Sequence, residues 1–264
     1  MDGMPLTGIP IIQRINIPLT FEPGTSWCYG TSTDWVGILV SRLTSFSLEE
    51  AMQKYIFDPL SIENFTFHQE NKPRVAKNLV KLAVRLGVEN PHYGIPVDNG
   101  QKIGYTDIPL YDNPTIDEYG GAGIMGNAVE YTRILQSILA NDGKILKAET
   151  VEEFFTPQLG DDSRRELGVL DAMNSEEAIF ASLPKGTKVD WGLGGLLLMS
   201  DTPTMKKGTA MWSGLPSLQW SIDRQTGLCL MYASNIVPWG DHQSGVYQRL
   251  FEKEMYQRFH DESK

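Results

Sequence analysis

The spacing of apolar residues changes from helical to strand-like in the last third of the chain, and this change limits the folds available. Four short apolar runs separated by turn residues predict consecutive antiparallel strands: Leu193–Met199, Gly208–Trp212, Leu218–Ile222 and Leu228–Ala233. In the third run apolar residues alternate with polar ones, which predicts one buried face and one face in water. The polar members of this alternation are Gln219, Ser221 and Asp223.

The preceding two thirds of the chain carries helical spacing. We expect helices over Thr31–Leu43, from the capping-box pair Ser47 and Glu50 to Pro59, over Val75–Leu86, around Tyr131–Leu139 and over Lys147–Phe155. The first should bury Trp35, Ile38, Leu39 and Leu43. A last helix is expected over Asp241–Phe259, with Tyr247, Leu250 and Phe251 on its apolar face.

Helices followed by an antiparallel meander and a closing helix predict the α+β class. We expect an N-terminal segment over 1–30 and a helical lobe over 31–188 that contains a long loop over 87–119. An antiparallel sheet and the C-terminal helix should occupy 189–264.

Composition excludes several classes of function. The chain of 264 residues has 23 basic and 33 acidic residues, a net charge of −10, so nucleic acid is not an expected partner. No apolar run approaches the roughly 20 residues of a membrane span. Two cysteines, Cys28 and Cys229, favour a reducing, cytoplasmic location. The four histidines show no metal-ligand spacing, so neither a metal nor a cofactor is expected.

Three short motifs are candidates for chemistry. The stretch Phe21–Gly30 ends a Pro-Gly turn with Tyr29, which is either a rigidly held functional phenol or a core aromatic residue. Trp212, Ser213 and Gly214 end an expected strand, where a backbone N–H either binds an oxyanion or simply belongs to a tight turn. Gly120–Gly126 lacks the lysine of a phosphate loop, so close packing is the better interpretation.

Taken together, these stretches resemble the serine β-lactamase/penicillin-binding-protein superfamily, in particular its branch of fungal esterases and lovastatin-type acyltransferases. The matching stretches are Phe21–Arg42, Tyr55–Leu60, Gly120–Leu139, Val189–Gly195 and Trp212–Gly227. The resemblance implies a β-lactamase/transpeptidase-like fold, with a helical lobe on an antiparallel sheet. It also implies a hydrolase or acyltransferase that acts on ester or thioester acyl groups in secondary-metabolite, polyketide-type biosynthesis.

The resemblance also implies roles for individual residues. A serine in an S-x-x-K helix would be the nucleophile, and Tyr29 would share its proton transfer as a base. The Leu215 N–H would donate to the oxyanion, and the substrate would lie along Trp212, Ser213 and Gly214. The partner so implied is a small acyl substrate.

The sequence departs from the family at the nucleophile. Only 28 residues precede Tyr29, and they contain no S-x-x-K; the pattern occurs only at Ser182–Lys185, where Pro184 disfavours a helix. The nucleophile helix and the first strands are therefore expected to be missing, which leaves a sheet edge open for association with another chain. Three hypotheses remain: a shortened hydrolase or acyltransferase, a non-hydrolytic cyclase or isomerase that uses Tyr29, and a catalytically dead binding remnant.

Overall fold

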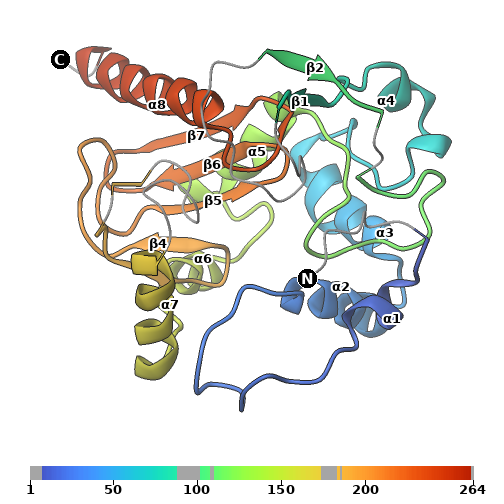
Figure 1. Cartoon of the computed structure of the whole chain (residues 1–264), viewed down its shortest axis with the longest axis horizontal. Coiled ribbons are helices and arrows are strands. Elements are labelled where there is room, and N and C mark those ends of the chain that lie inside the picture. The colour runs from blue at the N-terminus through green and yellow to red at the C-terminus, as the bar shows by residue number, and fades with distance from the viewer. Residues whose placement is uncertain (1–7, 88–101, 108–109, 174–182, 185, 263–264) are drawn as a thin grey trace. The chain divides into compact units, whose positions relative to one another are not determined.

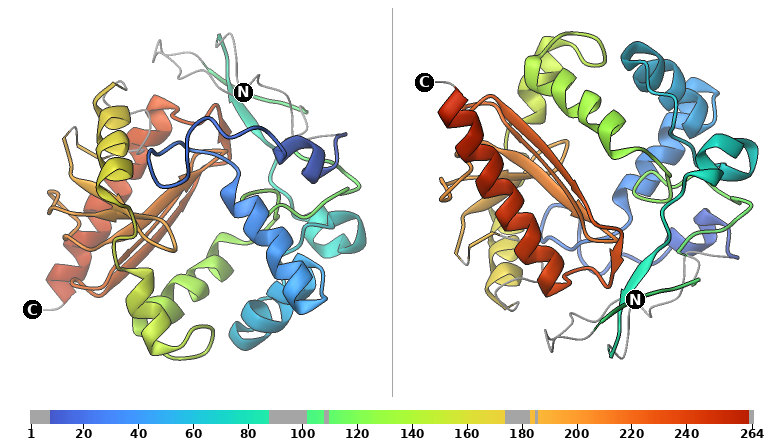
Figure 2. Two further views of the ribbon diagram at one scale, coloured as in Figure 1. Left: turned by 90° about the horizontal axis from the view of Figure 1, so that it is seen from below. Right: turned by 90° about the horizontal axis from the view of Figure 1, so that it is seen from above.

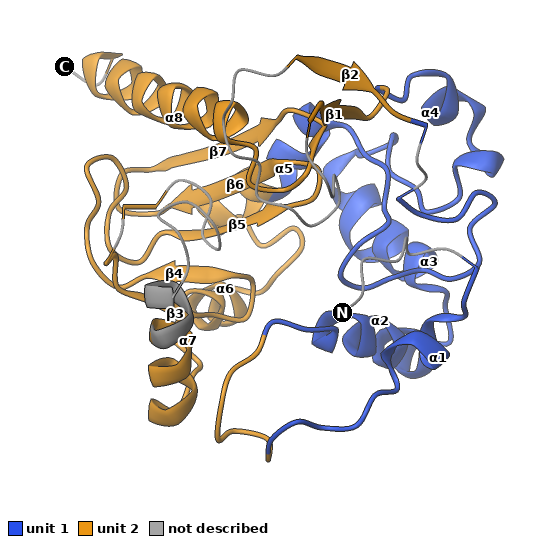
Figure 3. Cartoon of the chain, viewed as in Figure 1, with its two compact units in different colours: residues 1–21, 29–80, 107–134 blue, residues 22–28, 81–106, 135–264 orange. Residues whose placement is uncertain are grey.

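The computed structural model of the chain describes residues 8–87, 102–107, 110–173, 183–184 and 186–262 (Figure 1). The chain forms two compact units (Figure 3). Unit 1 contains residues 1–21, 29–80 and 107–134, and unit 2 contains residues 22–28, 81–106 and 135–264. The predicted α+β class is confirmed, with helices in both units and sheets in unit 2. No helix among the described residues combines the length and the apolar character needed to cross a bilayer.

Unit 1 is built mainly from helices. They are α1 (Ile11–Ile15), α2 (Ser32–Thr44), α3 (Leu48–Met52), a π-helical turn (Gln53–Phe57), two 3-10 turns (Asp58–Leu60 and Gln69–Asn71) and α4 (Pro73–Lys77). The predicted capping box is confirmed, because the Ser47 side chain accepts from the Glu50 N–H while the Glu50 side chain accepts from the Ser47 N–H. Helix α5 (Ala128–Ala140) runs across the boundary between the units and buries Leu135 and Ile138, as its periodicity predicts.

The position of α2 is confirmed, but the prediction of its buried face is wrong. The helix buries Asp34 and Gly37, whereas Trp35 and Leu39 are 42% and 51% exposed. Gly37 packs against the backbone of Gly120, and a Cβ atom at Gly120 would lie 2.1 Å from the Thr33 carbonyl oxygen. This close approach confirms that the glycine-rich loop serves packing. It also explains why small and polar residues of α2, rather than its apolar ones, face the loop.

Unit 2 contains a five-stranded antiparallel sheet in the order β3-β4-β5-β6-β7. Its strands are β3 (Val189–Trp191), β4 (Leu196–Leu198), β5 (Ala210–Gly214), β6 (Leu218–Asp223) and β7 (Leu228–Ala233). Helices α6 (Ala148–Phe154), α7 (Asp161–Met173) and α8 (His242–Glu262) complete the unit. The four predicted strands are confirmed, whereas β3 and α7 were not expected. Within the described residues, β7 pairs with β6 on one side and has no strand on the other.

The predicted wet face of β6 is wrong, because α8 lies along that face (Figure 2). Gln219, Ser221 and Asp223 are each no more than 5% exposed. The Gln248 amide donates to Gln219, and the Tyr256 hydroxyl donates to Asp223 over 3.0 Å. The apolar face expected for α8 is corrected as well, because Tyr247 and Leu250 are exposed while Ser244, Gln248 and Tyr256 are buried. Polar helix residues face the sheet because its polar side chains need partners once water is excluded.

The helix expected over Val75–Leu86 does not form as a single element. Its start lies in α4, and its end is β1 (Ala83–Arg85), which pairs with β2 (Ile103–Tyr105) and with β8 (Ile236–Val237). Both partners are distant in sequence, so a local periodicity could not indicate the strand. The expected loop over 87–119 contains β2, and its residues 88–101 and 108–109 lie outside the described part of the chain.

Asp241 holds β1 to the start of α8. The Arg85 guanidinium donates to both carboxylate oxygens of Asp241, over 2.7 and 2.8 Å, and both side chains are buried. The same carboxylate caps α8 by accepting from the Ser244 N–H over 2.9 Å. A bidentate buried pair of this kind fixes both geometry and register.

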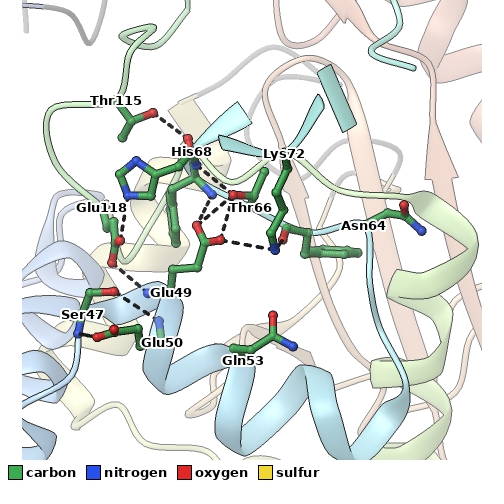
Figure 4. A network of polar contacts seen from close by, with 12 residues as sticks. Ser47, Glu49, Glu50, Gln53, Asn64, Thr66, His68, Lys72, Thr115 and Glu118 are labelled. Atoms are coloured by element: carbon green, nitrogen blue, oxygen red, sulfur yellow. Dashed lines mark hydrogen bonds and ion pairs between the residues drawn. The ribbon is translucent and has the colours of Figure 1, made fainter. Parts of the chain in front are cut away.

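His68 joins three segments of unit 1 (Figure 4). Its Nε2 lies 2.9 Å from a Glu118 oxygen, and its Nδ1 lies 3.0 Å from a Glu70 oxygen. The second Glu118 oxygen accepts from the Glu49 N–H at the start of α3, over 2.7 Å. Burial lowers the pKa of His68, but the hydrogen bonds to Glu118 and Glu70, with the charges of Glu118 and Glu49, raise it by more, so the net pKa lies above its ordinary value.

Asp241→Asn should lower the free energy of unfolding by about 3–5 kcal/mol, because it leaves the Arg85 charge buried without its ion partner. Glu254→Gln, which breaks the exposed pair with Arg258, should cost less than about 1 kcal/mol. Urea unfolding followed by circular dichroism measures both. Equal losses in the two variants would show that burial does not strengthen the dependence on Asp241.

The raised pKa of His68 predicts that stability depends on pH. The protonated imidazole is held by two carboxylates, so its contribution is full below the unfolded pKa of about 6.5 and is lost as pH rises through the raised folded pKa. At pH 6, His68→Gln should cost about 1.5 kcal/mol in urea unfolding, and the difference from wild type should shrink by pH 8.5. The exposed control His260→Gln should follow the wild-type curve. A wild-type profile identical to that of His68→Gln contradicts the assignment.

Candidate functional site

The end of strand β5 carries four of the residues singled out from the sequence. Gly214 is the last residue of the strand and pairs with Leu218, while Trp212 pairs with Trp220. The following residues turn the chain into β6. Trp212, Ser213, Gly214 and Leu215 therefore lie together at one end of the sheet of unit 2, as consecutive residues of a strand must.

Hydrogen bonds from β7 and the chain after it hold this strand end in place. The Trp239 indole N–H donates to the Ser213 hydroxyl over 3.2 Å, and the Ser234 hydroxyl donates to the Ser217 carbonyl over 3.0 Å. The Ser244 hydroxyl in α8 in turn donates to Ser234 over 2.9 Å. These contacts connect the turn to the start of α8. A site at this end of β5 is thus supported by two layers of structure.

Backbone groups at the strand end are accessible to a ligand. A Cβ atom built on Gly214 would meet no heavy atom within 4 Å. Within the described part of the chain, the Leu215 N–H has no acceptor. A backbone N–H beside open space is the group that stabilises the oxyanion formed in acyl transfer. The arrangement is therefore chemically suited to holding a carbonyl oxygen.

Three tryptophans pack in a row beside the strand end. Trp191 in β3 meets Trp212 edge-on, with ring centroids 4.6 Å apart, and lies 5.7 Å from Trp27. The Ser163 hydroxyl in α7 donates to the Ser26 carbonyl over 2.9 Å and so anchors the segment that carries Trp27. All three rings are half-buried, so they offer apolar surface to a ligand.

Sequence reasoning did not identify Trp191 as a site residue. Its signal was the glycine-rich stretch after it, because a Cβ atom on Gly195 would lie 2.8 Å from the Met211 carbonyl oxygen. Glycine at this position allows β4 to approach β5 and so brings Trp191 to Trp212. Such a packing requirement becomes visible only when the partner strand is known.

Tyr29 belongs to unit 1 and is 60% exposed. It is thus not a core aromatic residue, and its catalytic role stays a prediction. Of the S-x-x-K match, Ser182 and Lys185 lie outside the described residues.

One group in the described part of the chain is close enough to hold a metal ion. The ligand atoms of Glu49, His68 and Glu118 lie within 4.8 Å of one another (Figure 4). Their donors and acceptors are nevertheless already used. The Glu49 carboxylate accepts from the Thr66 hydroxyl over 2.7 Å and the Phe67 N–H over 2.6 Å, and it lies 3.4 Å from the Lys72 ammonium. The group is satisfied by protons and a lysine, and a cation would have to displace them.

Comparison with known proteins identifies relatives over nearly the whole chain. The family model described as Beta-lactamase matches residues 14–252. An ML-236A carboxylate methylbutanoyltransferase of Penicillium citrinum is 32% identical over 251 residues, which are 93% of this chain and 57% of that protein. A lovastatin esterase of Penicillium rubens is 32% identical over 259 residues, 94% of this chain and 60% of that protein.

A solved structure shows the same arrangement of the chain. Unliganded simvastatin synthase from Aspergillus terreus superposes with a TM-score of 0.82 at 26% identity, over 94% of this chain and 61% of that one. The chain thus spans only about three fifths of the length of the relatives it matches. The expected β-lactamase/transpeptidase-like fold is confirmed, and the chain belongs to the beta-lactamase family.

Proposed function

We propose that this chain takes part in hydrolysis or transfer of acyl groups from ester or thioester substrates in secondary-metabolite biosynthesis. The observation that carries the proposal is the strand end of β5, where an N–H without an acceptor in the described residues adjoins open space at Gly214 and a row of tryptophans. The printed names of the relatives, a methylbutanoyltransferase and an esterase, describe this reaction class. A cytoplasmic location is part of the proposal, supported by the low cysteine content.

In this proposal each group has a separate role. The Leu215 N–H stabilises the oxyanion that forms when a nucleophile attacks the acyl carbonyl, and donors of this kind contribute about 3–4 kcal/mol to the transition state. The rings of Trp212, Trp191 and Trp27 bind the apolar part of the acyl group. Ser213, held by Trp239, keeps the strand straight beneath the substrate.

Tyr29 is proposed as the base that exchanges a proton with the attacking oxygen. Chain connectivity supports this role, because Tyr29 follows Trp27 by two residues and two extended residues span at most about 7 Å. Trp27 in turn packs on Trp191. The phenol is also well exposed, as a group that meets a substrate must be.

The serine nucleophile is proposed to come from a polypeptide outside this chain. The only S-x-x-K pattern in the sequence includes Pro184, which disfavours the helix that such a motif needs. The relatives are longer than this chain, since it covers 57–60% of them. Association through the unpaired side of β7 belongs to the same proposal, because an open strand edge accepts a further strand.

Tyr29→Phe tests the proposed base. In a reconstituted system that turns over p-nitrophenyl butyrate, the substitution should lower kcat at least 100-fold, since proton transfer contributes about 10²–10⁴-fold. Tyr247→Phe, at a tyrosine with 64% exposure, is the matched control and should keep the wild-type rate. A fluorophosphonate probe then reports which polypeptide carries the serine. If neither the chain alone nor the chain with its complement reacts with ester, thioester or probe, the acyl-transfer proposal fails and a binding remnant is the remaining interpretation.

Gly214→Val tests the acyl-binding strip. The added side chain occupies the open space beside the strand and should raise the Kd for S-butyryl-N-acetylcysteamine, measured by tryptophan fluorescence, at least tenfold. Gly160→Val is the control, because a Cβ atom at Gly160 also meets nothing within 4 Å. Both variants should keep the wild-type Tm within about 2 °C. Unchanged binding by Gly214→Val would place the acyl group elsewhere.

A further inference from the structure

Helix α2 presents an apolar stripe to solvent. The four side chains of this stripe are Trp35, Val36, Leu39 and Leu43, with exposed fractions of 42%, 55%, 51% and 77%. At 100° per residue they fall within about 100° of one another around the helix axis, so they form one continuous face. Amphipathic helices of soluble proteins normally turn such a face toward the core.

The other sides of α2 are already occupied within unit 1. Ile38 packs beside Ile11 and Ile15 of α1, together with Tyr119. Gly37 lies against the backbone of Gly120, and the Asp34 carboxylate accepts from the Gly121 N–H over 2.9 Å. The helix is therefore held by its polar and small residues. Rotating it to bury the stripe would break these contacts, so the stripe can be covered only by something added to this surface.

We propose that this stripe, Trp35-Val36-Leu39-Leu43, is the docking surface for the polypeptide segment that the longer relatives possess and this chain lacks. The match covers 60% of the lovastatin esterase of Penicillium rubens, so 40% of that protein has no counterpart here. A segment of that size is long enough to supply an amphipathic helix that covers a four-residue stripe. Exposed contiguous apolar patches of a few hundred Å² mark such interaction sites.

The unpaired side of β7 in unit 2 gives independent support for a missing polypeptide. Strand β7 has the sequence LCLMYA, without proline or charge, and within the described residues it pairs only with β6. Isolated proteins normally protect such an edge with charges, proline or a covering element. Both features are explained by one added segment, whereas the docking on α2 does not depend on any catalytic role.

Docking on α2 would also bring the added segment next to Tyr29. The stripe begins six residues after Tyr29, and both belong to unit 1. A nucleophile carried by the docked segment would then be delivered beside the proposed base. This step rests on the proposed function, and the binding experiment below is independent of it.

The test uses the unmatched stretch of the Penicillium rubens lovastatin esterase as the probe, titrated into the full chain. We expect a one-to-one complex by light scattering with a Kd in the micromolar range or tighter by calorimetry. Binding should shift the fluorescence of Trp35 to shorter wavelength, and Trp35→Phe should remove that part of the shift. Leu39→Asp and Leu43→Asp should each weaken binding at least tenfold.

Val129→Asp is the matched control, because Val129 is 72% exposed on α5 and lies outside the stripe. It should bind within twofold of wild type. All three aspartate variants replace exposed residues, and their circular dichroism and Tm verify folding. The proposal is overturned if the segment does not bind, if Leu39→Asp and Leu43→Asp bind like Val129→Asp, or if the stripe instead joins two copies of this chain. Binding without ester turnover would support the docking and contradict only the acyl-transfer proposal.

Discussion

The larger unit depends on the burial of a polar sheet face beneath α8, and Asp241 is the residue that begins this arrangement. Its carboxylate binds the Arg85 guanidinium and caps the helix, so β1 and the start of α8 share one buried anchor. From there the helix carries Gln248 and Tyr256 to Gln219 and Asp223. Burial and the neighbouring Asp223 charge raise the pKa of Tyr256, which keeps its hydroxyl protonated as a donor. Each polar group on this face thus has a partner from α8.

This arrangement has a direct consequence for the candidate site. The hydroxyl chain from Ser244 through Ser234 to Ser217 connects the start of α8 to the turn after β5. The strand end is therefore held from behind, while Gly214 remains open. A substrate carbonyl placed there meets a backbone that is already oriented, which is the condition for oxyanion stabilisation without reorganisation. The tryptophan row supplies apolar contact for the acyl group.

Unit 1 has the opposite character, because its best apolar helix face is unused. Gly37, Asp34 and the Gly120 loop determine how α2 packs, and Trp35, Leu39 and Leu43 remain outside. The same chain spans about three fifths of its relatives. Both facts are consistent with a family member that provides one part of an acyl-transfer centre and needs a second polypeptide to complete it.

Local patterns in the sequence were sufficient for the α+β class, the capping box at Ser47, the face of α5 and the strands of the meander. They also indicated the strand end at Trp212–Leu215, because motif residues that are adjacent in sequence stay adjacent in space. Tertiary structure alone decided which faces are buried. The polar residues of β6 are covered because α8 brings partners to them, and α2 is turned outward because glycine permits close backbone approach. β1 and Trp191 acquired their places from strands distant in sequence. Periodicity records what a residue prefers, whereas burial depends on which element arrives to cover it, and that is a property of the whole fold.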